Sequence, residues 1–285
     1  IDKATVFHVR FFLSADEEYD RPGVKRMKMD ISWRFLRVWQ RNLAVYRKNW
    51  LINFLLPFFS PLFYLVAFGI SFSVFIVNIR YDANQVSYIS FIAPAIIAIN
   101  IMNNSFFENT YGSFVRMYYQ KTFDAMMSTP LNAEEIITGE IIWGATKSLI
   151  SSVIMLLVIS FFGVVSYPAA LLIIPVAFLG GIAFGAVGMC FTSMVKIIDL
   201  FSFPVFLFIT PMFLFSGTFF PLTGLPVWAQ QVALFLPLTH LVNVLRALNY
   251  GLFNADVLIG ICYLVVFSLI TIPIALFKMK RRLIK

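Results

Sequence analysis

Charged residues are scarce in this chain. Only 13% of its 285 residues are Asp, Glu, Lys or Arg, whereas a soluble globular domain carries about 25%. Hydrophobic residues make up 60% of the chain and aromatic residues 17%. This composition excludes an ordinary soluble domain, gives no reason to expect a nucleic-acid partner, and indicates a protein that lies in the lipid bilayer.

Cysteine and histidine are also rare, with two residues of each. Cys190 and Cys262 lie in separate apolar runs, which favours packed thiols over a disulfide or a metal pair. His8 and His240 are just as far apart, so no local motif assembles a metal site. The sequence therefore predicts no metal centre.

Two devices that power transport are missing from the sequence. No Gly-x-x-x-x-Gly-Lys-Ser/Thr motif occurs, so the chain has no P-loop to hold ATP phosphates. Residues 148–195 and 200–245 contain no charged side chain, whereas proton-coupled carriers need an ionisable relay within the membrane. Sodium coupling through backbone carbonyls stays open. The expected source of energy is a separate ATPase, and this chain itself is expected to bind no cofactor.

Long apolar runs predict an all-α membrane protein. A helix needs about 20 residues to cross the hydrocarbon core, and the sequence predicts six transmembrane helices at about 51–79, 86–107, 140–165, 169–195, 200–215 and 257–277. The short polar stretch Arg80–Asp82 is predicted to be a turn, and residues 1–29 a polar N-terminal tail rather than a signal peptide. Small residues three and four apart allow helices to approach closely in the fourth run, at Gly180, Gly181, Gly185 and Gly188.

Asp30–Trp50 predicts an amphipathic helix at the membrane surface. One broad face carries Ile31, Phe35, Val38, Trp39, Leu43, Tyr46 and Trp50, and the other carries Arg34, Arg37, Arg41 and Lys48. A basic helix with Trp on its apolar face lies in the plane of the lipid headgroups. Docking of a partner subunit on the same helix is an open alternative.

The stretch between the second and third runs, Tyr111–Glu135, is dense in the charges that the runs lack. Its spacing predicts a short amphipathic helix that ends at Thr129-Pro130, because proline cannot continue a helical hydrogen-bond ladder. Asn132 and Glu135 then form the pattern of a capping box that starts a new helix. This segment is suited to receive force from a soluble partner; a solvated surface helix is the alternative.

Three charged residues mark the ends of neighbouring runs: Glu108, Glu140 and Lys147. The carboxylates are positioned to pair with Arg116 or Lys147, while solvated helix-end carboxylates are equally compatible with the sequence. Lys147 can also extend its ammonium group to the membrane interface.

Gly217–Gly251 is uncharged before Arg246 and too rich in Pro and Gly for one helix. We expect two short helices, about Val227–Leu236 and Thr239–Leu248, that dip partly into the bilayer, where irregular backbone survives only if protein or a wet cavity surrounds it. His240 is expected to be a hydrogen-bonding residue rather than a ligand.

Six spans place both termini on one side. Of the 22 Lys and Arg residues, only Arg80 and Arg246 then fall on the other side. The positive-inside rule therefore predicts cytoplasmic termini, a cytoplasmic Tyr111–Glu135 segment and an outward-facing Gly217–Gly251 segment.

Several motifs resemble the ABC-2 type permeases, most closely the membrane subunits of nodulation-factor (lipo-oligosaccharide) exporters. The resemblance covers about Asp30–Phe277, which makes 30–285 the expected transmembrane domain, and its motifs are Phe107–Gly112, Arg116-Met117, Gln120–Met126, Thr129–Leu131, Gly139–Ile141, Ala145–Lys147 and Pro237–His240 followed by Arg246.

The resemblance implies a multi-pass permease of the cell inner membrane that dimerises, mainly through its first and fifth spans, and pairs with two ATPase subunits that bind ATP and Mg. It implies a cytoplasmic coupling helix near Arg116–Met127, with the contact residues Arg116, Met117, Gln120, Lys121, Thr122, Phe123, Asp124 and Met127. It also implies an extracellular gate in Pro221–Leu248, with Pro221, Gly224, Pro226, Pro237, His240 and Arg246.

The function expected from these observations is ATP-driven export of an amphiphile such as a lipid-linked oligosaccharide or polysaccharide. Drug export by the same architecture is the nearest alternative. An ion-coupled carrier or channel, and a scaffold that recruits a cytoplasmic partner, are alternatives of other classes.

Overall fold

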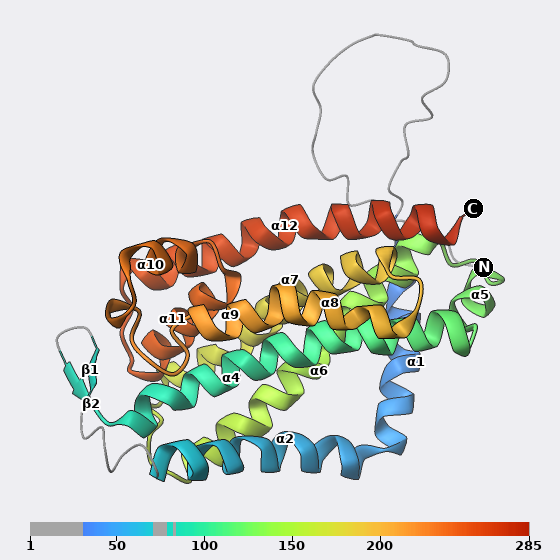
Figure 1. The fold of residues 1–285 in the computed structure, drawn as a ribbon. Helices are drawn as coiled ribbons and strands as arrows, with labels where there is room; N and C mark the ends of the chain where they lie inside the picture. Colours follow the sequence, from blue (N-terminus) through green and yellow to red (C-terminus); the bar gives the residue numbers. More distant parts are fainter. Residues whose placement is uncertain (1–30, 71–78, 82–83, 285) are drawn as a thin grey trace.

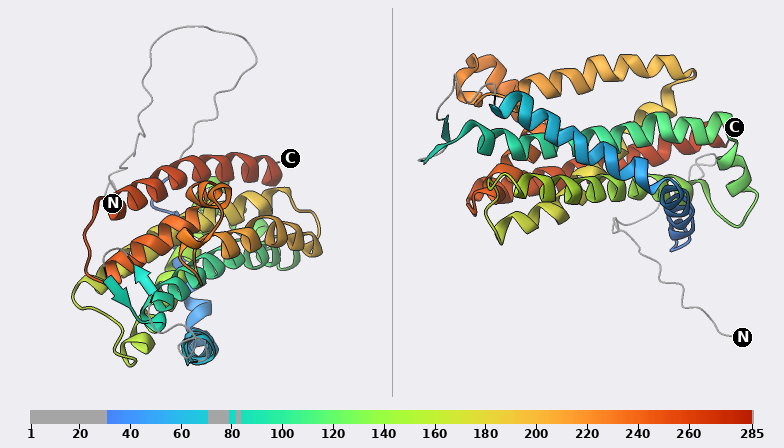
Figure 2. Two further views of the ribbon diagram at one scale, coloured as in Figure 1. Left: turned by 60° about the vertical axis from the view of Figure 1, so that its left-hand side comes forward. Right: turned by 90° about the horizontal axis from the view of Figure 1, so that it is seen from below.

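The computed structural model describes residues 31–70, 79–81 and 84–284. The predicted polar tail, residues 1–29, lies outside the described residues. The described chain is a bundle of long helices lying alongside one another, with α1 (Phe35–Lys48) set across one end of it (Figure 1). Figure 2 shows the same crossing from two further directions.

Within the described ranges, six helical segments are long and apolar enough to cross a membrane, as the sequence predicts. They are Trp50–Ala67, Tyr88–Tyr119, Ala133–Ser160, Ala169–Met194, Ile198–Phe215 and Ala255–Leu283. The composition thus gives a multi-pass membrane protein that is almost entirely helical.

The first span contains α2 (Trp50–Tyr64) and continues as a π-helical segment, Leu65–Ile70. Its predicted end at residue 79 is wrong, because Ile79 already belongs to strand β1 (Ile79–Tyr81). Strand β1 pairs antiparallel with β2 (Asn84–Val86), with Arg80 opposite Gln85. Arg80 and Tyr81 of the predicted short turn therefore belong to a strand, and Asp82 lies outside the described residues.

The second span is longer than predicted. Helix α4 (Tyr88–Phe107) is capped at its start by Ser87, whose hydroxyl accepts the Ser90 N–H. The helix does not stop at Glu108 but continues through two π-helical segments, Glu108–Gly112 and Val115–Tyr119. The only signal in the sequence at this point is the charge of Glu108. A charged residue does not end a helix when ion-pair partners lie nearby.

The third span also begins earlier than predicted, because α6 runs Ala133–Ser160 rather than from residue 140 to 165. Its start is the predicted capping box: the Asn132 side chain accepts an amide of the first turn, and Glu135 accepts the Asn132 N–H at 3.0 Å. Between these two spans lies α5 (Thr122–Met127).

The later spans agree closely with the predicted ranges. A 3-10 turn, Ala169–Leu172, leads into α7 (Ile173–Met194). The fifth span starts with the 3-10 turn Ile198–Phe201, and π-helical Val205–Ile209 separates α8 (Ser202–Pro204) from α9 (Thr210–Phe215). Helix α12 (Ala255–Leu283) extends past the predicted end at 277 and carries the basic C-terminal residues on its last turns.

Gly217–Gly251 forms two short helices, as its proline spacing predicts. A 3-10 turn at Leu222–Gly224 precedes α10 (Val227–Leu234), and α11 (Pro237–Asn249) follows after a bend of 86°. Proline at the first position of α11 suits a helix start, because its missing N–H would have no partner there.

Helix α7 packs against α4, α6 and α12 in the middle of the bundle. Its glycines permit this, as the small-residue spacing predicts. A Cβ added to Gly181 would lie 2.7 Å from the Ala145 Cα on α6, and one added to Gly188 would lie 2.9 Å from the Phe106 carbonyl oxygen on α4. Side chains there would force the helices apart.

The bundle has two distinct ends (Figure 1). We call the end that carries α5 and the last turns of α12 the α5 end, and the end that carries α10 and the β1–β2 hairpin the α10 end. Helix α1 lies at the α5 end, and the polar clusters described below divide between the two ends.

Candidate functional site

Four charged residues from three helical segments meet at the α5 end. Glu108 and Arg116 come from the π-helical continuation of α4, and Glu140 and Lys147 come from α6. A π-helical segment shifts the side chains that follow it around the helix axis, and such segments are frequent at functional sites. Here the two segments place Glu108 and Arg116 on the face that α6 covers.

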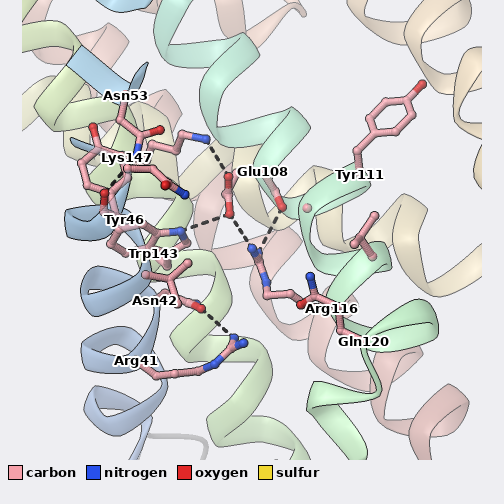
Figure 3. A pocket seen from close by; sticks show the side chains of 14 residues that line it. Arg41, Asn42, Tyr46, Asn53, Glu108, Tyr111, Arg116, Gln120, Trp143 and Lys147 are labelled. Carbon is pink, nitrogen blue, oxygen red and sulfur yellow. Dashed lines mark hydrogen bonds and ion pairs between the residues drawn. The ribbon is translucent and has the colours of Figure 1, made fainter. Parts of the chain in front are cut away.

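Arg116 bridges the two carboxylates, and Figure 3 shows its contact with one of them, Glu108. Its Nη1 donates to Glu108 Oε1 at 2.8 Å, and its Nε and Nη2 donate to Glu140 Oε2 at 2.9 and 2.5 Å. Lys147 Nζ donates to Glu108 Oε2 at 2.8 Å. The pairing that the sequence leaves open is therefore present, and the solvated alternative is wrong. We call Glu108, Arg116, Glu140 and Lys147 the charge cluster.

Neutral donors complete the coordination of both carboxylates. Glu140 is fully buried, and it also accepts from Ser113 Oγ at 2.8 Å and from Asn42 Nδ2 at 2.9 Å. Glu108 accepts from Trp143 Nε1 at 3.1 Å. Every carboxylate oxygen of the cluster thus has a donor, which is the condition under which buried charges are tolerated.

Asn42 makes the charge cluster a three-helix junction, because it belongs to α1. Val38 and Asn42 are the buried side chains of that helix, and Gly139 on α6 lets it approach: a Cβ there would lie 2.9 Å from the Phe35 carbonyl oxygen. Trp39 Nε1 donates to Thr146 Oγ1 at 3.0 Å. Contacts on successive turns of α1 therefore hold this helix against α6.

The arginines of the predicted polar face of α1 differ in how exposed they are. Arg34 and Arg37 are exposed, although Arg34 Nη1 donates to the Pro130 carbonyl at 2.5 Å. Arg41 is half-buried and donates to Asn42 Oδ1 at 3.0 Å. Burial lowers the pKa of Arg41, with Glu140 opposing and Arg116 reinforcing the shift. Arg41 is therefore more buried than Arg34 and Arg37, the other two arginines of this face.

A cleft of about 440 Å³ opens beside the charge cluster, where α1 turns into α2. Its charged and aromatic lining includes Arg41, Tyr46, Glu108, Arg116, Trp143 and Lys147, and amide side chains come from Asn42, Asn49, Asn53 and Gln120. Burial, reinforced by the charge of Glu108, raises the pKa of Tyr46, so its hydroxyl stays protonated. Figure 3 shows these side chains around the cleft, with Tyr111 directed away from the cluster.

The predicted coupling helix, Arg116–Met127, is not one continuous helix. Lys121 has a φ of 52°, in the left-handed region, and this residue separates the end of the second span from α5. Arg116 and Met117 belong to the span, and Met117 is buried. Helix α5 contains Thr122, Phe123, Asp124 and Met127.

Helix α5 presents a polar surface and an apolar underside. Gln120, Lys121 and Asp124 are exposed, and Lys121 Nζ lies 5.3 Å from the ring centre of Tyr118. Phe123 is fully buried in a cluster with Phe114, Ile136 and Ile137, while Thr122 and Met127 are half-buried. The six-residue helix is therefore anchored by one aromatic ring and open to a partner on the other side.

The segments that flank α5 are tied to both termini of the described chain. Glu134 in the first turn of α6 forms an ion pair with Lys280 near the end of α12. Arg282 donates to the carbonyls of Thr192 and Val195 at the end of α7. Near the start of the described chain, the Ser32 hydroxyl donates to Glu135.

At the α10 end, Arg246 is buried and joins three elements. It lies on α11, its Nε donates to the Phe91 carbonyl on α4 at 3.1 Å, and its Nη2 donates to the Thr218 carbonyl at 2.8 Å. Its guanidinium carbon also lies 3.7 Å from the ring centre of Phe91. Arg246 thus fixes α11 to the start of the second span.

His240 forms the expected hydrogen bond, from Nε2 to the Leu234 carbonyl oxygen at 2.8 Å, and its ring stacks on Tyr263 of α12. Pro226 immediately precedes α10 and Pro237 starts α11, while Pro221 and Gly224 flank and end the small 3-10 turn. The predicted gate residues therefore gather at the α10 end, far along the bundle from the charge cluster.

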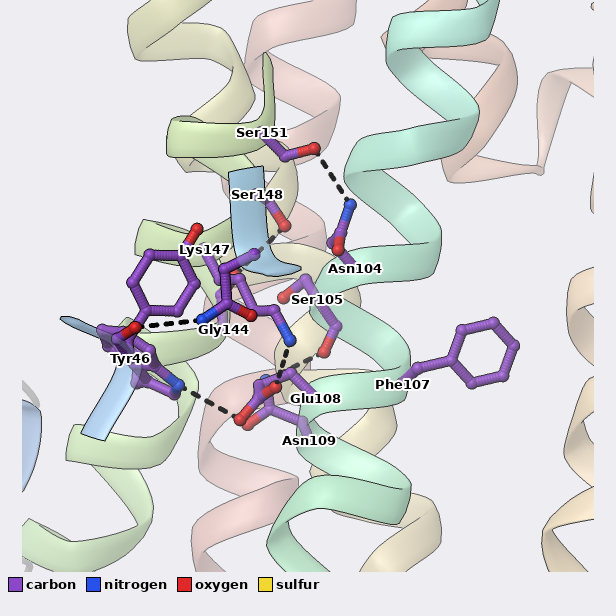
Figure 4. Close-up of polar contacts among 12 residues, drawn as sticks. Tyr46, Asn104, Ser105, Phe107, Glu108, Asn109, Gly144, Lys147, Ser148 and Ser151 are labelled. Atoms are coloured by element: carbon purple, nitrogen blue, oxygen red, sulfur yellow. Dashed lines mark hydrogen bonds and ion pairs between the residues drawn. The ribbon is translucent and has the colours of Figure 1, made fainter. Parts of the chain in front are cut away.

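A polar layer that was not predicted from the sequence lies between α4, α6 and α7 (Figure 4). Ser105 Oγ donates to the Gly181 carbonyl at 2.5 Å, Ser148 Oγ donates to the Ile101 carbonyl at 3.1 Å, and Ser151 Oγ donates to Asn100 Oδ1 at 2.5 Å. Asn104 donates to Ser151 at 3.3 Å. Side chains of this kind three and four residues apart on α4 are the signal that could have revealed the layer.

The fold and the cluster together define a multi-pass helical membrane protein in which a buried charge cluster joins α1 to the second and third spans, close to the short exposed helix α5. The sequence profile of the family described as ABC-2 type transporter matches residues 34–250. The chain belongs to the ABC-2 type transporter family.

Curated relatives cover almost the whole chain. Nodulation protein J of Rhizobium leguminosarum bv. viciae is 33% identical over 255 residues, which are 90% of this chain and 96% of the relative. Nodulation protein J of Rhizobium meliloti (strain 1021) is 33% identical over 82% of this chain and 89% of the relative. The inner membrane transport permease YadH of Escherichia coli (strain K12) is 22% identical over 84% of this chain and 92% of the relative.

Proposed function

We propose that this chain is the membrane subunit of an ATP-driven exporter of the cell inner membrane, with both termini in the cytoplasm. A separate ATPase subunit docks at the α5 end, and the export path opens at the α10 end. The family and the six spans support a transport permease, and the positive-inside distribution of Lys and Arg supports the orientation.

The observation that carries the proposal is the attachment of an exposed short helix to a buried charge cluster. A force applied to α5 reaches the bundle through two connections. One is the buried Phe123 ring, and the other is the helical segment that carries Arg116. Arg116 is held by Glu108 and Glu140, and Glu140 also holds α1 through Asn42. A displaced α5 would therefore move the second span, the third span and the surface helix together.

Two features indicate the partners: the absence of a P-loop from the sequence, and the exposed apolar side chains on the first and fifth spans. Without a P-loop, ATP and Mg are bound by the ATPase subunits, two copies of which serve a permease dimer. The first and fifth spans carry large exposed apolar side chains, among them Phe63, Phe203, Phe206 and Leu207. In a bilayer, lipid or a second copy of the chain covers such faces, and we assign part of them to the homodimer contact.

The cargo we propose is an amphiphile such as a lipid-linked oligosaccharide or polysaccharide. Two Rhizobium relatives at 33% identity, both named nodulation protein J, support this class. The half-buried Asn100 and Asn104 and the buried Ser151 interrupt otherwise apolar helices. A surface that offers both amides and apolar side chains suits a molecule with sugar and acyl parts.

Purification of the full-length chain co-expressed with an ABC ATPase subunit from the same source tests the proposal. We expect a stable complex whose ATP hydrolysis is stimulated by the permease, and Asp124→Lys to weaken the stimulation. Asp256→Lys makes the same charge change in an exposed position at the opposite end of the bundle and is the matched control. Absence of any bound ATPase, with a folded permease, would overturn the proposal.

A further inference from the structure

The cleft between α1, the start of α2, α4 and α6 has more positive than negative charge. Arg41, Arg116 and Lys147 contribute three positive charges, and Glu108 and Glu140 contribute two negative charges, which leaves an excess of one. Glu140 lies directly behind the lining, bonded to Asn42 and Arg116. The excess does not depend on any titration, because guanidinium and ammonium groups stay charged at neutral pH.

The excess charge resides on Arg41. Arg116 and Lys147 are engaged with carboxylates at 2.5–2.9 Å. Among the residues that the structure describes, no carboxylate lies within ion-pair distance of Arg41, and its guanidinium donates to the neutral amide of Asn42. A half-buried guanidinium offers five N–H groups in a planar fork that matches a phosphate. Its surroundings lower its pKa through burial, so an anion beside it would relieve an existing cost.

The position of the cleft specifies where the anion comes from. Asn49 lies at the corner between α1 and α2, and the first membrane span begins at Trp50, so the cleft opens where the hydrocarbon core begins. Helix α1 has an amphipathic pattern and exposed Trp33 and Trp50 rings flank it, as they do in helices at the headgroup level. Basic pockets between membrane helices at this level bind anionic lipid headgroups.

The remaining lining suits a phosphodiester with a polar head. Tyr46 keeps its proton and can donate its hydroxyl, and amides of Asn49, Asn53 and Gln120 offer further donors and acceptors. The Trp143 ring supplies an apolar wall, packed edge-on against Tyr46 with ring centres 5.5 Å apart. A volume of about 440 Å³ lies within the range of small-ligand pockets, about 300–1,000 Å³.

We propose that this cleft binds the headgroup of an anionic phospholipid, with Arg41 as the residue that pairs with the phosphate. The lipid fills the corner between α1 and α2 and neutralises the excess charge beside the charge cluster. The inference rests on the interfacial position of α1 and is independent of the cargo and of the ATPase.

Native mass spectrometry of the full-length chain, released from mild detergent with added phosphatidylglycerol, tests the proposal. We expect the wild-type chain to retain one phosphatidylglycerol per copy and to retain phosphatidylcholine of the same acyl chains poorly. Arg41→Gln should bind phosphatidylglycerol about tenfold more weakly, the loss typical of one charge-assisted hydrogen-bonded contact. Arg37→Gln removes the same charge from an exposed position on the same helix and should bind as the wild type does.

Equal retention by the wild type, Arg41→Gln and Arg37→Gln would overturn the site, provided that size-exclusion profiles show all three folded. A separate arm uses soluble phosphate compounds. If inorganic phosphate or glycerol phosphate at millimolar concentration raises the Tm of the wild type as much as phosphatidylglycerol does, and not that of Arg41→Gln, the anion is a soluble one and the lipid assignment is wrong. A Tm shift with phosphatidylglycerol alone supports it.

Discussion

Replacing Glu140 with alanine should destabilise the whole α5 end of the bundle. Glu140 is fully buried and accepts hydrogen bonds from Arg116, Ser113 and Asn42, so its removal leaves three donors without this acceptor. Removing one partner of a buried ion pair costs about 3–5 kcal/mol. Arg116 keeps Glu108 and its side chain is 14% exposed, which places the expected loss at the lower end, about 3 kcal/mol.

The measurement is thermal unfolding of the purified chain in detergent, followed by tryptophan fluorescence. A loss of about 3 kcal/mol lowers the Tm of a chain of this size by about 6–12 °C. Glu140→Gln keeps the shape and one acceptor oxygen, so its Tm should fall between those of Glu140→Ala and the wild type.

Glu134→Ala is the matched control for this prediction. Glu134 is a buried carboxylate on the same helix, but it pairs with Lys280 alone, whose side chain is 21% exposed and can turn into water. The expected loss is about 1 kcal/mol. If Glu134→Ala lowers the Tm as much as Glu140→Ala does, the charge cluster has no special role in holding the three helices together, and the reasoning fails.

Three further predictions concern the other parts of the molecule. Charge reversal at Lys121 or Asp124, which are both exposed at α5, should lower transport-coupled ATP hydrolysis several-fold while membrane insertion stays normal; normal transport by both variants would exclude α5 as the coupling element. His240→Gln keeps a donor opposite the Leu234 carbonyl and should transport at the wild-type level, so complete loss of transport would refute a purely hydrogen-bonding role. Gly181→Ala should lower the Tm by several degrees, because the new Cβ meets the α6 backbone at 2.7 Å, whereas Gly224→Ala, with open space around it, should leave the Tm unchanged.

Local signals in the sequence predicted the parts of the fold that local chemistry controls. The capping box of Asn132 and Glu135 forms because both partners lie within one turn. The bend between α10 and α11 follows from Pro237, and the close contact of α7 with α6 follows from its glycines. The number of apolar runs likewise matched the number of spans.

The prediction failed where distant residues decide the outcome. The second span was expected to end at Glu108, but Arg116 and Lys147 neutralise that carboxylate and allow the helix to continue. The left-handed conformation of Lys121 has no local signal, since lysine carries no preference for positive φ. The same holds for Asn42, one polar residue on an apolar face, whose role depends on Glu140 about a hundred residues away.

The central claim, that the ATPase engages α5, is tested most directly by site-specific photo-crosslinking in the assembled transporter. A photoreactive amino acid replaces Asp124 on α5 or, as the control at the α10 end, the exposed Phe220. The account predicts an adduct with the ATPase subunit from position 124 and none from position 220. An adduct from position 220, or no adduct from position 124 in a complex that still co-purifies with the ATPase, would contradict it.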